Sequence, residues 1–470
     1  MKAYLSILEH DELLKIHEAS LTILSNTGLR IYSKEACNLL HDYGAKIDKD
    51  NIVYIPEYMV EDALKNVAQD MVLGARDKKY TIHPHELSIP AFSTCGFSSI
   101  IYDYKTGKSR IPTEKDLIEY AKIADYFSEI KYFSAFDASL KKNADFSDLY
   151  TLYITLQHTA KPIQCFCSDG KTALLQSKLS KIVANKSKEP IFSSYVMPIS
   201  PLTLGKGTAE AIINFAKEGI PISPYGTILA NSTAPATVAG SLALSNAENL
   251  AILTLCKCAN KKGEMIYSTD TCPMDFLTGA INYESPEYLL FAIANRQIAD
   301  YYGLVSCVSH SANEELPSNS ASLAVYKEKI ISNFLVNTKL SSALGSKDSG
   351  LAASLLDMVF GAYIVEEVSA LFKEEPLEND DILLSTMEKI SQGNFSISVQ
   401  RKEELALRQK IKEHRFENIL NTKDVTMQIQ EIIDDILLYH KSTPIPQNQL
   451  EAMAAFMQEA ETLYLEEGDY

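Results

Sequence analysis

Aromatic side chains stand at the ends of several short apolar segments in the middle of this sequence. Phe136, Tyr195 and Tyr225 all occupy such positions. The faces of tyrosine and phenylalanine rings attract a trimethylammonium group with an energy of roughly 0.5–2 kcal/mol per ring. Because the sequence has no tryptophan, a cage for such a cation must rest on Tyr, Phe and carboxylates. The pattern predicts a pocket for a small organic cation, and plain packing of the rings is the alternative.

Four polar residues follow similar segments. Asp270, which follows Thr269, would balance the charge of the cation or cap a helix. His310 would bind a substrate carboxylate or serve as a hydrogen-bonded structural histidine. Asn313 and Glu314 come soon after it and would line the pocket or face solvent. These loops contain no obvious pair of nucleophile and base, so acid–base or nucleophilic catalysis is not predicted from them.

The cysteines offer a weaker indication of metal chemistry. Cys165 and Cys167 lie two apart on a predicted strand and so point to one face. Catalytic zinc normally takes three protein ligands, and no histidine is placed to complete this pair. Cys256 and Cys258 lie two apart in a predicted helix, where side chains diverge. We therefore predict no metal site and interpret all eight cysteines as reduced thiols of a cytoplasmic protein.

The elements that must position these residues follow a strict alternation from about residue 88 onward. Eight short apolar or β-branched segments cover 91–104, 131–138, 162–168, 190–197, 221–229, 264–269, 303–309 and 339–345. Eight amphipathic stretches follow them, near 113–128, 145–160, 170–185, 205–218, 236–260, 286–301, 320–336 and 350–373. Eight strand–helix units predict an α/β fold, a closed parallel (β/α)8 TIM barrel, with an open doubly wound sheet as the alternative. In a barrel, the loops after the strands build the active site.

Two further regions flank the predicted barrel. Residues 1–87 are expected to form a mainly helical N-terminal cap, the barrel to span 88–375, and residues 376–470 to form a C-terminal helical extension. Helices of the extension are predicted near 381–391, 401–412, 424–440 and 447–465. They offer an interface for the homo-oligomer that we expect.

Charge and hydropathy exclude several classes of function. The net charge of −17 argues against binding to nucleic acid, which requires clustered lysine and arginine. No uninterrupted apolar stretch approaches the roughly 20 residues of a membrane span. The N-terminus is too acidic and its apolar stretch too short for a secretory signal. These features predict a cytoplasmic protein that is bound to neither membrane nor nucleic acid.

Several of the loops resemble blocks of the trimethylamine methyltransferase family. The most specific are residues 232–240 (STAPATVAG) with 246–251 (NAENLA), and 273–279 (PMDFLTG) with 285–287 (SPE). Residues 74–77 (GARD), 104–107 (YKTG) and 198–202 (PISPL) are similar too. The blocks span most of residues 1–370 in the family's order. The resemblance is therefore specific for the family and less specific for the substrate.

The resemblance implies a (β/α)8 barrel that moves a methyl group from a methylated amine to Co(I) of a separate, cognate corrinoid protein, with no cofactor bound tightly by the barrel itself. The trimethylamine branch of the family uses pyrrolysine, whose imine captures the amine. Every residue of this chain is a standard one, which resembles the branch that acts on quaternary amines. A quaternary nitrogen has no lone pair for an imine and is already an activated leaving group. Glycine betaine, proline betaine and carnitine-like compounds are the expected donors.

The chain departs from the family pattern in the loop after the seventh strand. An Asp-rich segment is expected there, and residues 313–320 read NEELPSNS instead. Two other functions stay open at this point. One is a zinc-dependent corrinoid methyltransferase for methanol or a methylthiol. The other is a barrel that binds methylated amines, or the corrinoid partner, without catalysis.

Overall fold

A computed structural model describes residues 4–96, 98–136, 144–184, 189–308, 320–372, 388, 391–392 and 425–467. Eight parallel strands form its central sheet, in the spatial order β11-β9-β8-β7-β4-β16-β15-β13. They are β4 (Ala91–Thr94), β7 (Ile130–Ser134), β8 (Ile163–Phe166), β9 (Phe192–Val196), β11 (Ile222–Pro224), β13 (Tyr267–Ser268), β15 (Ser306–Cys307) and β16 (Leu340–Leu344). Two backbone hydrogen bonds join the outermost strands: Ile222 N donates to Glu264 O, and Ile266 N donates to Ile222 O. The sheet is therefore a barrel.

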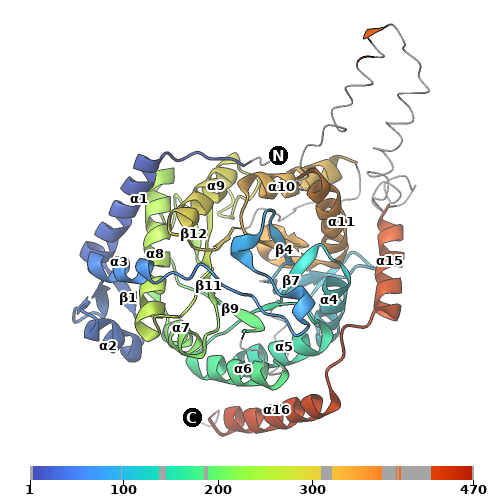
Figure 1. Ribbon diagram of the computed structural model, residues 1–470, viewed down its shortest axis with the longest axis horizontal. Coiled ribbons are helices and arrows are strands. Elements are labelled where there is room, and N and C mark those ends of the chain that lie inside the picture. Colours follow the sequence, from blue (N-terminus) through green and yellow to red (C-terminus); the bar gives the residue numbers. More distant parts are fainter. Residues whose placement is uncertain are drawn as a thin grey trace.

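A helix comes after each barrel strand, and the eight helices surround the barrel in a ring (Figure 1). They are α4 (Glu114–Tyr126), α5 (Ala144–His158), α6 (Gly170–Val183), α7 (Lys206–Glu218), α8 (Val238–Ala259), α9 (Pro286–Tyr301), α10 (Ser320–Val336) and α11 (Leu355–Phe372). Local sequence fixes several of their ends. Thr113 and Asp116 form a capping box at α4, Ser285 caps α9, and Gly219 ends α7 at a φ of 72°. The predicted (β/α)8 barrel is confirmed, and the open-sheet alternative is wrong.

The amino end of the barrel is filled by apolar side chains. Met71, Leu73 and Ile82, from the segment that precedes β4, are buried in one cluster with residues of five barrel strands or their flanks. The barrel partners in this cluster are Ala91, Tyr132, Ile266, Val305, Cys307 and Leu340. We call this cluster the apolar floor.

The N-terminal elements pack along one side of the barrel, against α8 (Figure 1). They are α1 (His10–Thr22), β1 (Leu29–Ile31), α2 (Lys34–Asp42), β2 (Lys46–Ile47), β3 (Ile52–Tyr54) and α3 (Glu57–Lys65), with a π turn at Ile23–Thr27 and short 3₁₀ helices at Lys78–Tyr80 and Pro84–Glu86. The region thus combines α-helices with short strands. The short strands join β10 (Thr203–Leu204) in a four-stranded sheet, so this region is tied to the loop after β9.

Two small sheets stand at the carboxyl end of the barrel, because their strands directly follow barrel strands. One pairs β12 (Thr227–Ala230) with β14 (Asp270–Pro273). The other consists of β5 (Ile100–Tyr102), β6 (Ser109–Arg110), β17 (Ser346–Lys347) and β18 (Ala352–Ser354), with a 3₁₀ turn at Asp348–Gly350. The predicted single strand over 221–229 is thus wrong at its end, because β11 stops at Pro224 and β12 belongs to a different sheet.

Two C-terminal helices lie against the ring of helices. Helix α15 (Val425–Tyr439) packs on α4 and α11, and α16 (Gln447–Glu467) packs on α5 and α6 (Figure 1). The buried residues of α15 are Ile429, Ile433 and Ile436, three or four positions apart, as an amphipathic helix requires. These helices confirm the predictions for 424–440 and 447–465. The helices predicted near 381–391 and 401–412 fall almost entirely outside the described residues.

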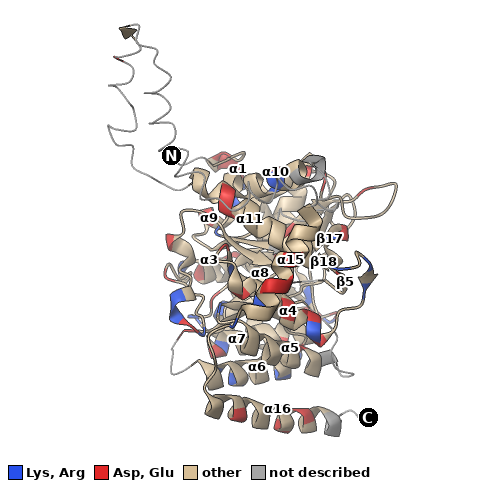
Figure 2. Cartoon of the chain, turned by 90° about the vertical axis from the view of Figure 1, so that its right-hand side faces the viewer, with Lys and Arg blue, Asp and Glu red and all other residues tan. Residues whose placement is uncertain are grey.

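Charged residues of both signs lie on the surface, and a long apolar helix is buried. Acidic and basic segments are interspersed over the helices on the face drawn in Figure 2. Among the described helices, only α8 is long and apolar enough to cross a membrane, and 83% of its most apolar window is buried inside the protein. It is therefore a core helix of the barrel.

Candidate functional site

Two tyrosines lie side by side at the carboxyl end of the barrel. Tyr195 is the fourth residue of β9, and Tyr225 follows β11, the neighbouring strand. Their ring centroids are 5.7 Å apart and their planes are inclined by 79°. The Tyr195 hydroxyl donates to Ser134 Oγ at 3.0 Å, and the Tyr225 hydroxyl lies 3.4 Å from Ser342 Oγ. Both rings are thus held in fixed orientations inside the barrel.

A buried carboxylate lies next to this pair. Asp270 is only 6% exposed, and its backbone N–H donates to the carbonyl of Gly226, the residue after Tyr225. Its carboxylate accepts hydrogen bonds from the hydroxyls of Tyr283 and Tyr288. Burial raises the pKa of Asp270 to about 6, and the two tyrosine hydrogen bonds limit that rise. Asp270 is therefore an anion at neutral pH in a largely apolar setting.

The tyrosine pair and the carboxylate form a single cluster. The rings of Tyr283 and Tyr288 are 4.9 Å apart. Burial, and after it the negative charge of Asp270 and the proximity of Tyr225, raise the pKa of Tyr288 well above its usual range. We call Tyr195, Tyr225, Tyr283, Tyr288 and Asp270 the onium cluster. Its four rings and one carboxylate match the chemistry of an organic cation.

A glycine makes room for the cluster. A Cβ atom on Gly96, just after β4, would lie 3.0 Å from Tyr195 Cε2 and 2.9 Å from Ser134 Cβ. Any larger residue would push the Tyr195 ring out of place. Gly96 is thus part of the wall that positions this ring.

The structure brings together some of the residues that the sequence singled out. Tyr195, Tyr225 and Asp270 are all members of the onium cluster. Phe136 is fully buried, and its ring packs edge to face against Tyr120 of α4, with centroids 5.1 Å apart. It therefore lies in the layer between the barrel and its helices.

The remaining candidates, His310, Asn313 and Glu314, lie outside the described residues. Sequence analysis missed Tyr283 and Tyr288, the two hydrogen-bond donors to Asp270. The available signal was their position on either side of the cap of α9, Ser285, in a loop that follows Asp270 along the chain.

Two family blocks turn out to build the rim of the barrel. Residues 103–107 and 275–279 share the pattern D-x-x-T-G, and both form the same turn. Asp103 Oδ1 accepts from Thr106 N, and Asp275 Oδ1 accepts from Thr278 N. The glycines that end the two turns have φ values of 67° and 71°, which only glycine adopts easily. These aspartates hold their own loops and are not placed to bind a ligand.

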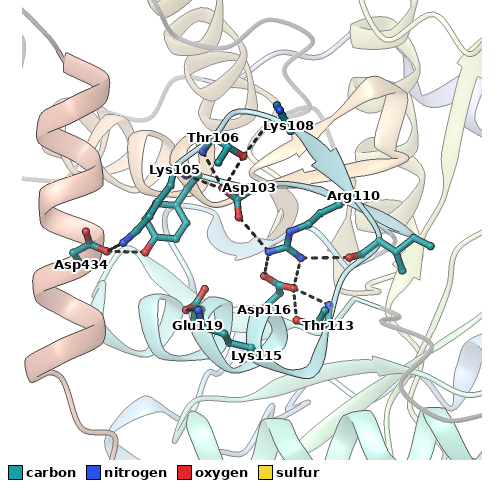
Figure 3. A network of polar contacts seen from close by, with 12 residues as sticks. Asp103, Lys105, Thr106, Lys108, Arg110, Thr113, Lys115, Asp116, Glu119 and Asp434 are labelled. Carbon is teal, nitrogen blue, oxygen red and sulfur yellow. Dashed lines mark hydrogen bonds and ion pairs between the residues drawn. The ribbon is translucent and has the colours of Figure 1, made fainter.

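The first turn anchors the C-terminal helix α15 (Figure 3). Tyr104 donates to Asp434 Oδ1 at 2.7 Å, and Lys105 lies 3.1 Å from the same oxygen. Arg110 makes two hydrogen bonds to Asp116, at 2.7 and 2.8 Å, and also reaches Asp103. This network joins the rim sheet to α4 and α15.

The second turn presents apolar side chains to solvent. Phe276 is 71% exposed and Leu277 is 97% exposed. Because the turn lies between β14 and α9, it belongs to the rim at the carboxyl end. Exposed apolar residues of this size on a rim are typical of a surface that another protein covers.

Other family blocks serve the scaffold. Asn246 donates to Ser20 and Tyr302 and so ties α8 to α1. Glu248 accepts from Ser200 and from the backbone of Leu202, which holds the loop after β9. Thr233 accepts from the backbone N–H of Leu229 in the turn after β12. These contacts give the three residues structural roles in holding loops and helices together.

The cysteines do not converge with other metal ligands in the described part of the chain. No group of three or more His, Cys, Asp or Glu side chains within those ranges has the geometry to hold a metal. Cys165 and Cys167 are buried, and burial raises the pKa of both thiols. Zinc ligands require the opposite, a readily formed thiolate.

The sequence is similar to those of known methyltransferases. The family model for trimethylamine methyltransferase (MTTB) matches residues 2–460. The chain is 26% identical to a trimethylamine methyltransferase MttB of Methanosarcina barkeri, over 98% of this chain and 96% of that protein. It is 24% identical to a glycine betaine methyltransferase of Desulfitobacterium hafniense, over 84% of this chain and 83% of that protein.

The fold has a counterpart among solved structures. The monomethylamine methyltransferase MtmB of Methanosarcina barkeri superposes with a TM-score of 0.52 at 10% identity, over 92% of this chain and 88% of that one. At this identity the likeness concerns the fold alone, and it agrees with the barrel described above. Because the family model covers nearly the whole sequence, the chain belongs to the trimethylamine methyltransferase (MTTB) family.

Proposed function

We propose that this protein takes a methyl group from a quaternary amine and passes it to the corrinoid of a separate, cognate protein. Glycine betaine, proline betaine and carnitine-like compounds are the proposed donors. The observation that carries the proposal is the onium cluster, in which tyrosine rings and the buried carboxylate of Asp270 lie together at the carboxyl end of the barrel.

The cluster suits a permanently charged nitrogen. A quaternary ammonium group cannot donate a hydrogen bond, so its recognition depends on ring faces and on a balancing charge. Tyr195 and Tyr225 supply rings, and Asp270 supplies the charge. Tyr283 and Tyr288 donate to Asp270 and keep its buried carboxylate ionised at neutral pH.

The reaction requires little covalent or acid–base catalysis from this chain. The reduced corrinoid of the partner protein supplies the nucleophile that accepts the methyl group. The amine that leaves is neutral, so no residue has to protonate it. The tasks left to the barrel are to orient the donor and to exclude water, effects worth several kcal/mol in activation free energy. A site of fixed rings without an acid–base pair is suited to these tasks.

The absence of pyrrolysine supports a quaternary donor over trimethylamine. The sequence consists of standard residues, so it has no imine with which to capture a tertiary amine. The comparisons alone do not distinguish the donors, because both trimethylamine and glycine betaine methyltransferases are among the relatives.

The partner protein would cover the rim at the carboxyl end. Phe276 and Leu277 stand out there as exposed apolar side chains. We propose that the corrinoid arrives with that partner and that this chain binds no cofactor tightly. The eight unpaired thiols suit a cytoplasmic location. Leu438 and Tyr439, both exposed at the end of α15, make the C-terminal helices the proposed contact in a homo-oligomer.

The test mixes the purified protein with corrinoid proteins reduced to Co(I) and with single amines. Methyl-Co(III) has a distinct visible spectrum, and the demethylated amine is identified by mass spectrometry. We expect the corrinoid to be methylated when at least one quaternary amine is the donor and not when trimethylamine is the donor. Methylation by trimethylamine alone, or by no amine of a broad panel, would overturn the proposal.

A further inference from the structure

A buried lysine lies at the same end of the barrel as the onium cluster and has no role in the function proposed so far. Lys347 is in β17, three residues after barrel strand β16 ends, and is only 3% exposed. In β17 it pairs with Ala352 of β18, which places it in the rim sheet. A lysine this deeply buried is rare unless its charge has a partner.

The surroundings of Lys347 leave its ammonium group incompletely satisfied. Its nearest charged neighbour is Asp357 in the first turn of α11, with Nζ and Oδ1 3.9 Å apart. Lys347 Nζ also lies 5.9 Å from the centre of the Tyr102 ring. Within the described part of the chain, this nitrogen has no hydrogen-bond partner. An ammonium group that is buried without hydrogen bonds is costly, so the site is built for an additional acceptor.

A second orphaned group lies in the same neighbourhood. The hydroxyl of Tyr120 in α4 is buried and has no hydrogen-bond partner among the described residues. Burial, followed by the nearby Cys95 and Asp357, raises the pKa of this tyrosine well above its usual range. Tyr120 and Lys347 therefore both lie near Asp357. Two buried groups that can donate hydrogen bonds are thus left without partners among the described residues in one neighbourhood.

Residues close to Lys347 in the sequence contact the onium cluster or its loops. Ser342, in the strand that precedes Lys347, lies 3.4 Å from the hydroxyl of Tyr225. The turn that follows Lys347 reaches the loop of Tyr283, where Ser349 Oγ donates to the carbonyl of Ile281 at 3.4 Å. The chain on both sides of Lys347 thus contacts the onium cluster or the loop that carries it.

The strand order indicates roughly how far the barrel strands that precede Asp270 and Lys347 are from each other. Asp270 follows β13 and Lys347 follows β16, and only β15 lies between these two strands. Neighbouring strands are about 4.8 Å apart, so the barrel strands that lead to the two charged residues are roughly 10 Å apart. This spacing is on the scale of a small zwitterion whose positive end would face Asp270 and whose negative end would face Lys347.

We propose that Lys347 binds the carboxylate of the methyl donor while the onium cluster holds its quaternary nitrogen. This inference rests on the proposed function and specifies its substrate class as carboxylated betaines. Donors without a carboxylate, such as choline or tetramethylammonium, would occupy only the cluster. In the absence of donor, Asp357 is the counter-ion of Lys347.

The experiment compares the wild type with Lys347→Met, which keeps the length and apolar stem of the side chain. Because removing Lys347 leaves Asp357 buried, the double variant Lys347→Met, Asp357→Asn is measured beside it. Lys131→Met, an exposed lysine at the start of β7, is the matched control. Methyl-Co(III) formation is followed with glycine betaine and with tetramethylammonium, and binding of both donors is measured by calorimetry without corrinoid.

We expect the two Lys347 variants to raise the KM and the Kd for glycine betaine about tenfold to a hundredfold, the usual effect of removing a hydrogen bond to a charged group. The constants for tetramethylammonium should change less than threefold, and Lys131→Met should change neither donor. An equal loss for both donors, or no loss for glycine betaine, would overturn the role of Lys347 and leave the proposed function standing. Failure of the wild type with every quaternary amine would instead count against the proposed function.

Discussion

Tyr195 and Tyr225 meet edge to face at the carboxyl ends of two neighbouring barrel strands, and each is held by a serine hydroxyl from another strand. Four strands of the barrel thus contribute to the orientation of two rings. The arrangement separates two properties that mutation can test independently, because the ring face attracts a cation and the hydroxyl only fixes the ring.

Substitution of Tyr225 tests the contribution of the ring face. Tyr225→Leu should raise the KM for a quaternary donor between about twofold and thirtyfold, which corresponds to the loss of one cation–π contact. Tyr225→Phe keeps the ring and should leave the KM within about threefold of the wild type. Initial rates of methyl transfer give both values. If Leu and Phe had equal effects, ring-face recognition at this position would be wrong.

The ionisation of Asp270 predicts a pH dependence. Its pKa in the folded protein is raised to about 6 from an ordinary value of 3.8, chiefly by burial. Between these two values the folded state binds more protons than the unfolded state, so the stability of the fold decreases as pH rises through this window. The ionised form is the one that attracts a cation. We therefore expect kcat/KM for a quaternary donor to rise as pH increases through about 6 and then to level off.

Asp270→Asn separates function from stability at the same position. The KM for the donor should rise about tenfold or more, and the increase of kcat/KM near pH 6 should disappear. The midpoint of thermal unfolding at pH 7.5 should rise by a few degrees, because the variant no longer buries a charge. A variant that lost both activity and stability would indicate a purely structural role for Asp270.

The exposed side chains of Phe276 and Leu277 predict where the proposed partner protein docks. Leu277→Asp should raise the KM for the corrinoid protein about tenfold, since a buried leucine contributes about 1.5–3 kcal/mol to the free energy of association. The KM for the amine should not change. Leu371→Asp, at the exposed C-terminal end of α11, provides the control and should change neither value. Equal effects of the two substitutions would contradict docking at the rim.

A lysine away from the site predicts a large loss of stability. Lys161 is 2% exposed and donates to the carbonyls of Ala124, Phe127 and Ile130 at 2.6, 2.5 and 2.6 Å. Lys161→Met leaves three buried acceptors without donors and should lower the free energy of unfolding by about 3 kcal/mol or more. Chemical denaturation measures this change, and Lys131→Met should remain within about 0.5 kcal/mol of the wild type.

Most of the barrel could be predicted from the sequence, because its strands are buried on both faces and appear as separate apolar segments. The rim sheets could not. Residues 221–229 look like one continuous strand, yet β11 ends at Pro224 and β12 pairs with β14 instead. Gly226 lies at this break, and a Cβ atom there would lie only 3.1 Å from Pro198 Cγ and 3.3 Å from Glu248 Oε2, two residues that are distant in the sequence. Such contacts cannot be predicted from local composition.

The candidate site was predicted in part for a similar reason. Tyr195, Tyr225 and Asp270 could be found because they lie at or just after the carboxyl ends of barrel strands, and these ends meet in a barrel. Tyr288 lies in α9 and Lys347 in a rim strand, so their nearness to the site depends on how loops fold back. The packing of Phe136 against Tyr120 likewise depends on the position of α4 relative to β7.

The apolar floor has a kinetic consequence for the proposed reaction. Leu73 and Ile82 belong to the packing at the amino end, so we expect a donor to reach the onium cluster from the carboxyl end. The partner protein would seat over that same end. The amine would therefore have to bind before the partner docks, and the demethylated product would leave only after the partner dissociates. The packing at the amino end would thus impose an ordered binding mechanism.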